Sequence, residues 1–177
     1  MNTIAASPPE ENVPRNYVLD SFAIIGYFDD EPGSEIVGDL IRQVPKSASL
    51  FLSIINFGEI AYEAERERGD AGLQTRLAEV RSLPIAFVAA DETTVLAAAH
   101  IKAKHPVSYA DAFAIALAQE LKATIVTGDP EFRTVEKFVD ILWLREPERK
   151  RKQIEKKQAK ERRATYRVKS NRERHPK

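Results

Sequence analysis

The sequence predicts an α/β protein built on a largely parallel sheet that helices cover on both faces. Short apolar runs alternate along the chain with longer segments of helical periodicity. The connections between them are short, as is typical of βαβ units. A run without polar alternation, such as Thr124–Thr127, is expected to be buried on both faces, as strands of parallel sheets are.

Five strands are predicted, each bounded by a helix or by a turn signal. They are Asn16–Leu19, Ser49–Leu52, Ile85–Val88, Thr124–Thr127 and Val139–Trp143. The fourth strand ends at Gly128-Asp129-Pro130, because Pro cannot donate to a strand ladder and Gly tolerates unusual dihedral angles.

Helical segments fill the intervals between these strands. They are Phe22–Phe28, Ser34 to near Pro45, Ile54–Arg68, Ala71–Leu83, Glu92–Lys104, a small-residue helix that ends at Lys122, and a short turn of helix at Phe132–Val135. Gly69 is expected to end the third of them. That helix has its apolar positions at Ile55, Ile60, Tyr62 and Ala64.

Composition excludes several classes of protein. There is no cysteine, which rules out disulfides, thiolate metal sites and cysteine nucleophiles. A reducing, cytoplasmic location is the simplest expectation. The opening residues lack the features of a signal peptide, and no apolar segment has the length of a membrane helix. We therefore expect a soluble protein without a membrane partner.

The net charge of zero hides an asymmetry along the 177 residues. Residues 1–144 carry 12 Lys and Arg against 22 Asp and Glu, a balance of −10, whereas residues 145–177 carry 15 against 5, a balance of +10. We expect a Pro-rich disordered segment (1–15), an acidic folded domain (16–144) and a basic tail (145–177) that is disordered or an isolated helix.

Three aspartates lie near the expected ligand-binding edge of the sheet. Asp20 follows the first predicted strand and Asp129 follows the fourth. Right-handed crossovers return parallel strands in one direction, so both residues are expected outside the carboxyl ends of the strands, where open α/β sheets bind ligands. Asp111 lies in the first turn of a helix. Structural roles remain open, since Ser108-x-x-Asp111 resembles a capping box and Asp129-Pro130 resembles an N-cap.

A fourth acid, Glu59, lies inside a predicted helix between the apolar positions Ile55 and Ile60. Asn56 precedes it by three residues and so lies on the same helix face. A carboxylate beside apolar positions is harder to explain as a solvated charge than Glu63, which lies further along the helix.

Four short motifs occur in the order, and against the expected elements, of PIN-domain ribonucleases. They are V-L-D-S at Asp20, S-x-x-N-x-x-E from Ser53 to Glu59, S-Y-A-D-A-F-A-I-A at Asp111 and T-G-D-P-E-F at Asp129. From about Asn16 to Leu144 the chain resembles this superfamily, and within it most resembles the VapC-type toxins of type II toxin–antitoxin systems. Each motif alone is weak, but four in this order form a specific signal.

The resemblance implies an α/β/α sandwich around a five-stranded parallel sheet, and RNA cleavage that depends on Mg²⁺ or Mn²⁺. The positions that match the family's acidic quartet are Asp20, Glu59, Asp111 and Asp129. The matching polar residues beside them are Ser21, Asn56 and Thr127. Asp20 and Asp129 are expected to be the principal metal ligands, and Asp111 is expected to complete the site. Glu59 is expected to ligate the metal or orient a water.

The chemistry of the acids agrees with this comparison. Hard divalent cations take oxygen ligands, and a bound cation would relieve the repulsion between clustered carboxylates. A bound cation also lowers the pKa of a water ligand and stabilises charge on phosphoryl oxygens, so the expected reaction is phosphodiester hydrolysis with water as the nucleophile.

Two departures from the family pattern stand out. Gly128 and Pro130 occupy positions where a polar or charged residue is frequent, which could alter the substrate rim. The long basic tail is also unusual; it is either simply solvated, an arm that gathers RNA, or a segment that docks on the acidic body.

The family resemblance also implies an RNA substrate, a cognate antitoxin and a homodimer. The helices Phe22–Phe28 and Ile36–Ile41 are candidate contact surfaces, unless they simply pack in the core. Two other functions stay open: a PIN-like module that binds RNA without cutting it, and a Mg²⁺-dependent phosphohydrolase of small molecules. Binding alone has no use for an acidic pocket, and such phosphohydrolases usually carry D-x-D after the first strand, where this chain has Asp20-Ser21-Phe22.

Overall fold

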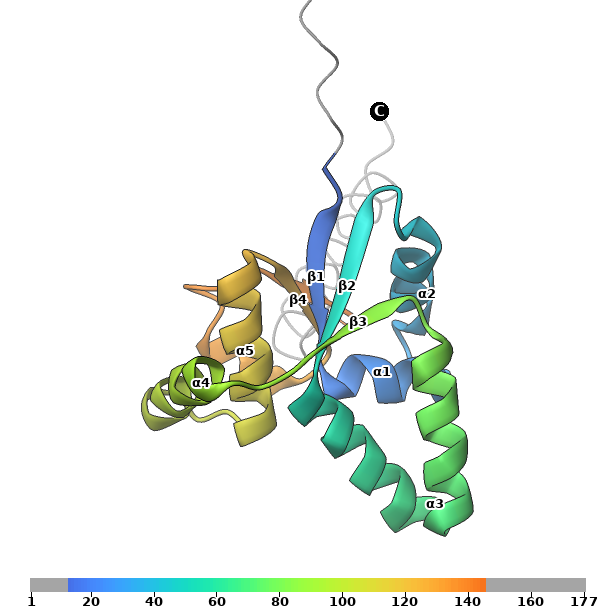
Figure 1. Cartoon of the computed structure of the whole chain (residues 1–177). Helices are drawn as coiled ribbons and strands as arrows, with labels where there is room; N and C mark the ends of the chain where they lie inside the picture. Colours follow the sequence, from blue (N-terminus) through green and yellow to red (C-terminus); the bar gives the residue numbers. More distant parts are fainter. Residues whose placement is uncertain (1–12, 146–177) are drawn as a thin grey trace, which may run out of the picture. The chain divides into compact units, whose positions relative to one another are not determined.

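The computed structural model describes residues 13–145, in which a five-stranded parallel sheet is flanked by helices (Figure 1). The strands are β1 (Arg15–Leu19), β2 (Ala48–Ser53), β3 (Ile85–Val88), β4 (Thr124–Thr127) and β5 (Ile141–Trp143). The helices are α1 (Ser21–Phe28), α2 (Ser34–Gln43), α3 (Ile54–Ser82), α4 (Glu92–Lys104), α5 (Tyr109–Leu121) and the 3₁₀ helix η1 (Pro130–Thr134). The predictions for most of residues 1–15 and of the basic tail concern residues 1–12 and 146–177, which lie outside the described part.

The strand order is β3-β2-β1-β4-β5, and every neighbouring pair is parallel. The chain builds outward from β1 through β2 to β3, and then returns to add β4 and β5 on the other side. Tyr17 of β1 accordingly pairs with Leu50 of β2 and with Thr124 of β4. The direction in which the chain adds strands to the sheet therefore reverses between β1 and β4. Such a switch point opens a crevice at the carboxyl ends of the strands.

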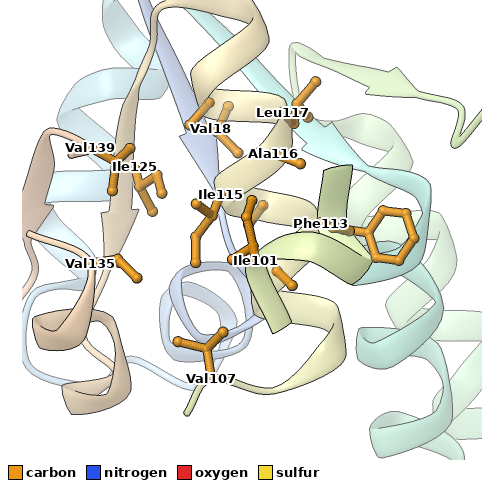
Figure 2. Packing of buried hydrophobic residues seen from close by; sticks show 14 of the residues in the cluster. Val18, Ile101, Val107, Phe113, Ile115, Ala116, Leu117, Ile125, Val135 and Val139 are labelled. Carbon is orange, nitrogen blue, oxygen red and sulfur yellow. The ribbon is translucent and has the colours of Figure 1, made fainter. Parts of the chain in front are cut away.

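Helices cover both faces of this sheet, which confirms the predicted α/β/α sandwich. On one face, α4 and α5 pack over Val18 and Ile125 of the central strands (Figure 2). On the other face, α1, α2 and α3 pack over Leu19 and Val126. Neighbouring residues of a strand thus belong to the hydrophobic cores on opposite faces of the sheet, because side chains alternate across the pleat.

Helix α5 is buried along most of its length, from Asp111 to Ala118. Four of its five alanines are buried, and its large side chains Phe113, Ile115 and Leu117 belong to the hydrophobic cluster on this face of the sheet (Figure 2). The predicted small-residue helix is therefore the central packing element of one layer.

Several element boundaries differ from the predictions. The two helices predicted on either side of Gly69 are recorded as one element, α3, but Gly69 itself is non-helical (φ 67°, ψ −170°) and kinks it. Strand β1 begins one residue early, at Arg15, and β5 spans only Ile141–Trp143. Tyr62, predicted as a core position, is 50% exposed, so that prediction was wrong.

The helices predicted as contact surfaces contribute strongly to the core. Ile24 of α1 and Val37 and Leu40 of α2 are buried in it, and most of the other apolar side chains of these helices pack partly against it. The predicted homodimer contact through these helices stays a prediction. Of the helices between residues 13 and 145, none has both the length and the apolar character needed to cross a bilayer.

Candidate active site

The four predicted acids come from four separate segments and line one pocket. Asp20 follows β1 and Asp129 follows β4, and these two strands are neighbours at the switch point of the sheet. The backbone N–H of Asp20 donates to Val126 O over 3.3 Å, which ties the two strand ends together. Glu59 reaches the same pocket from the first part of α3, and Asp111 from the start of α5.

The pocket has a volume of about 220 Å³. Its lining residues are Asp20, Ser21, Phe22, Ile25, Glu59, Glu63, Ser108, Asp111, Asp129 and Glu131. Six of these are carboxylates, and none is Lys, Arg or His. A pocket of this size can hold a metal ion with waters and a phosphate, and it is smaller than the pockets that enclose drug-sized ligands.

Three of the aspartates also cap helices. Asp20 accepts the N–H of Ala23 at the start of α1 (2.8 Å), and Asp129 accepts the N–H of Glu131 at the start of η1 (2.8 Å). Asp111 forms the predicted capping box with Ser108. These capping bonds fix the carboxylates in place. Each aspartate therefore has the structural role that the sequence left open and also lines the pocket, so the two roles are compatible.

Thr127 connects the first and last of the acids. It is fully buried, and its hydroxyl donates to Asp20 Oδ2 over 2.5 Å. The same hydroxyl oxygen accepts the backbone N–H of Asp129 over 2.9 Å. One side chain at the end of β4 therefore orients the Asp20 carboxylate and the turn that carries Asp129.

A second polar chain orients Glu59. The Asn56 Nδ2 group donates to Ser21 Oγ (3.1 Å), and the Ser21 hydroxyl donates to Glu59 Oε2 (2.5 Å). Asn56 is completely buried, and no residue between 13 and 145 donates to its Oδ1 atom. Because Ser21 directly follows Asp20, this chain links the acid of α3 to the end of β1.

Burial raises the pKa of two of the acids. Asp20 is 1% exposed, and burial raises its pKa to about 8, although hydrogen bonds from Thr127 and Ala23 act in the opposite direction. Burial likewise raises the pKa of Asp111 to about 6. The neighbouring acids add to both effects, including the Asp129 charge, which acts on each of the two. These carboxyl groups thus lack a compensating positive charge.

The donor set fits a hard divalent cation. Oxygen is the only ligand type that the carboxylates, Ser21 and Ser108 offer, and Mg²⁺ and Mn²⁺ prefer oxygen. Within residues 13–145, no three carboxylate or imidazole side chains are already arranged as metal ligands.

The sequence analysis did not name five of the lining residues as site residues: Phe22, Ile25, Glu63, Ser108 and Glu131. Glu63 was interpreted as a solvated charge, but it lines the pocket, and its spacing of four from Glu59 on one helix would have indicated this. Glu131 lies in the turn after Asp129. Phe22 was assigned only to an apolar helix, and nothing in its local sequence indicates a place beside the acids.

Comparison with known proteins agrees with this geometry. Residues 17–138, which are more than half of the chain, match the family model described as PIN domain. No curated protein matches the sequence.

Solved structures share the fold at low sequence identity. The VapBC2 complex from Rickettsia felis, bound to a DNA fragment from its promoter, contains a chain with a TM-score of 0.58 and 14% identity, over 72% of this chain and 97% of that one. VapBC-1 from nontypeable Haemophilus influenzae gives a TM-score of 0.57 and 18% identity, over 73% and 98%. VapC20 from Mycobacterium tuberculosis, a sarcin–ricin loop cleaving toxin, gives 0.55 and 14%, over 67% and 94%. With the match over residues 17–138, these likenesses in fold lead to one conclusion: the chain belongs to the PIN domain family.

Proposed function

We propose that this protein is a metal-dependent endoribonuclease that hydrolyses RNA phosphodiester bonds. The observation that carries the proposal is the convergence of Asp20, Glu59, Asp111 and Asp129 in one pocket of a PIN domain. Grouping so many carboxylates without a cationic side chain is unfavourable for stability. A bound divalent cation would offset the repulsion between these carboxylates, which gives a reason for grouping them.

In this proposal Asp20, Asp111 and Asp129 hold Mg²⁺ or Mn²⁺, while Glu59 ligates the metal or orients a water. A bound metal supplies charge neutralisation at the phosphate and a more acidic water ligand. The chain's own part is positioning, because each carboxylate already has a fixed hydrogen-bond partner.

The supporting polar residues have separate tasks. Thr127 orients the Asp20 carboxylate by donating its hydroxyl proton to Oδ2, and Ser21 orients the Glu59 carboxylate in the same way through Oε2. Asn56 in turn fixes the Ser21 hydroxyl. Such outer partners typically change metal affinity or activity by about 10- to 100-fold when they are removed.

No lining residue can act as a neutral-pH base through imidazole or amine. Attack by the RNA 2′-hydroxyl with a histidine acid–base pair is therefore not supported by this pocket. Hydrolysis by water, with the carboxylates binding the metal and receiving the proton, fits the residues present.

We further propose that the protein is the toxin of a toxin–antitoxin pair, acting in the cytoplasm with a cognate antitoxin and as a homodimer. The support is the fold shared with chains of VapBC complexes and with a toxin described as cleaving the sarcin–ricin loop. The alternative of a small-molecule phosphohydrolase is not favoured, because such enzymes usually carry D-x-D after the first strand, where this chain has Asp20-Ser21-Phe22.

The test is cleavage of structured and single-stranded RNAs with Mg²⁺, with Mn²⁺ and with a chelator. The wild type is compared with Asp20→Asn and Asp111→Asn, and with Asp91→Asn as the matched control, since Asp91 caps α4 as Asp20 caps α1 but lies outside the pocket. We expect metal-dependent cutting by the wild type and the control, and a loss of at least about 100-fold in the two site variants. Equal cutting by all four forms would point to a contaminant and remove the proposed site.

A further inference from the structure

The acidic pocket has one apolar wall. Among its ten lining residues only Phe22 and Ile25 are apolar, and both are half-buried. They are three residues apart on α1, so they lie on one face of that helix. Phe22 is two residues beyond Asp20, the most buried acid of the pocket, and both residues line it.

The position of the Phe22 ring depends on the absence of a side chain at Gly128. A Cβ atom at Gly128 would lie 2.4 Å from Phe22 Cε1, 3.0 Å from Cδ1 and 3.1 Å from Cζ. The φ angle of Gly128 lies outside the left-handed region, so space and not backbone conformation explains this glycine. One side of the ring therefore packs directly on the backbone that precedes Asp129.

This contact explains why the turn carries Gly128 where a polar or charged residue was expected. Any larger residue would push the ring away from the strand end. The ring projects from α1 and packs against the β4–η1 turn at Gly128. Two of the acids that are proposed to bind the metal, Asp20 and Asp129, line the same pocket. An aromatic ring packed in this position provides a preformed surface for contact with a ligand.

We propose that Phe22, backed by Gly128 and extended by Ile25, is the contact surface for a nucleobase next to the scissile phosphate of single-stranded RNA. The proposal rests on the proposed ribonuclease function. In this proposal the phosphate and the cation occupy the carboxylate side of the pocket, and the base lies against its apolar side. Every base has an aromatic face, and stacking on a protein ring is a general way to hold unpaired RNA.

A purely structural role for Phe22 predicts different kinetics from a role in base contact. If the ring only keeps water from Asp20, its loss changes the metal concentration needed for activity, and it does so for every substrate alike. If the ring contacts a base, its loss changes the Michaelis constant for RNA, and the change vanishes when that base is missing.

The experiment uses the full chain and a short RNA that the wild type cuts, together with versions that carry a single abasic ribose on either side of the cut. Binding is measured by fluorescence anisotropy with Ca²⁺, and kcat and KM are measured with Mn²⁺. The variants are Phe22→Leu and the ring-preserving Phe22→Tyr. Phe28→Leu is the matched control, because Phe28 lies on the same helix but packs against Arg76 outside the pocket.

We expect Phe22→Leu to weaken binding and to raise KM by roughly 10-fold on intact RNA, as for loss of one base–aromatic stack, with kcat and the half-saturating Mn²⁺ concentration nearly unchanged. Phe22→Tyr and Phe28→Leu should stay close to wild type. At one abasic position the wild type should lose the same factor, and Phe22→Leu should lose nothing more.

Wild-type cutting with no effect of Phe22→Leu, or with an equal loss on every abasic RNA, would overturn the base contact and leave the ribonuclease function intact. Failure of the wild type both to bind and to cut RNA would overturn the two together. If Phe22→Leu does not fold, the abasic series on wild type decides, since a uniform response at all positions also contradicts the proposal.

Discussion

Replacing Asp20 with asparagine should stabilise the metal-free protein at pH 8. Asp20 is 1% exposed, and burial raises the pKa of its carboxyl group to about 8. Asparagine has nearly the same shape and can still accept the N–H of Ala23, but it carries no charge to bury. The substitution therefore removes an electrostatic cost while keeping the helix cap.

The direction of the pH dependence follows from the raised pKa. Above about pH 4 the unfolded chain releases this proton while the folded chain keeps it, so the free energy of unfolding falls as the pH rises toward 8. Asp111, with a pKa raised to about 6, adds a fall over the lower part of this range. With respect to these two groups, stability is thus greatest below about pH 4.

The rise from 3.8 to about 8 sets a ceiling of about 6 kcal/mol on the stability that Asp20 costs at pH 8. Water entry and side-chain relaxation reduce this cost, so we expect Asp20→Asn to gain about 2 kcal/mol at pH 8 and little at pH 5. Added Mg²⁺ or Mn²⁺ should restore the wild type at pH 8 by binding the folded state, and should act less on the variant.

The assay is urea unfolding at pH 5, 6, 7 and 8, followed by the fluorescence of Trp143, the sole tryptophan of the sequence. Asp91→Asn serves as control, because hydrogen bonds from the Thr94 backbone and side chain lower the pKa of Asp91 and keep it ionised across this range. A wild-type unfolding free energy that is flat or rises from pH 5 to 8 would refute the reasoning. So would an Asp20→Asn variant that keeps the wild-type slope.

Three further predictions concern residues around the site and the core. Thr127→Val removes the hydroxyl donor to Asp20 and should weaken Mn²⁺ binding about 10-fold by calorimetry, whereas Thr127→Ser should not. Gly128→Ala should displace the Phe22 ring and lower the free energy of unfolding by about 1–3 kcal/mol in urea titrations; an unchanged value contradicts the tight contact. Asp29→Ala removes one of the two carboxylate partners of the buried Arg76 guanidinium, leaving only Glu79, and should cost about 1–3 kcal/mol in the same assay.

The order of strands and helices could be predicted because each element has a local cause. The apolar run Thr124–Thr127 lacks polar alternation and is nearly all buried, and the small-residue helix α5 is buried from Asp111 to Ala118. Strand order is different, since no local feature states that β1 pairs with both β2 and β4. Tyr62 fits a helical apolar stripe but is 50% exposed, and part of α3 extends away from the sheet (Figure 1).

The same distinction holds at the candidate site. Asp20 and Asp129 were predictable because a residue after a parallel strand must lie at the carboxyl edge of the sheet. The contact of Phe22 with Gly128 was not, because it joins residues that are distant in sequence and only the folded chain brings them together. The departure at Gly128 was visible in the sequence, but its reason was not.

The most direct test of the central claim is mass spectrometry of the RNA products formed in H₂¹⁸O with Mn²⁺. We predict that each cut adds one solvent oxygen to a terminal phosphate, that no 2′,3′-cyclic phosphate forms at any time, and that Asp20→Asn abolishes the products while Asp91→Asn does not. A cyclic phosphate, or products that persist in Asp20→Asn or in a chelator, would contradict metal-dependent hydrolysis at the carboxylate pocket.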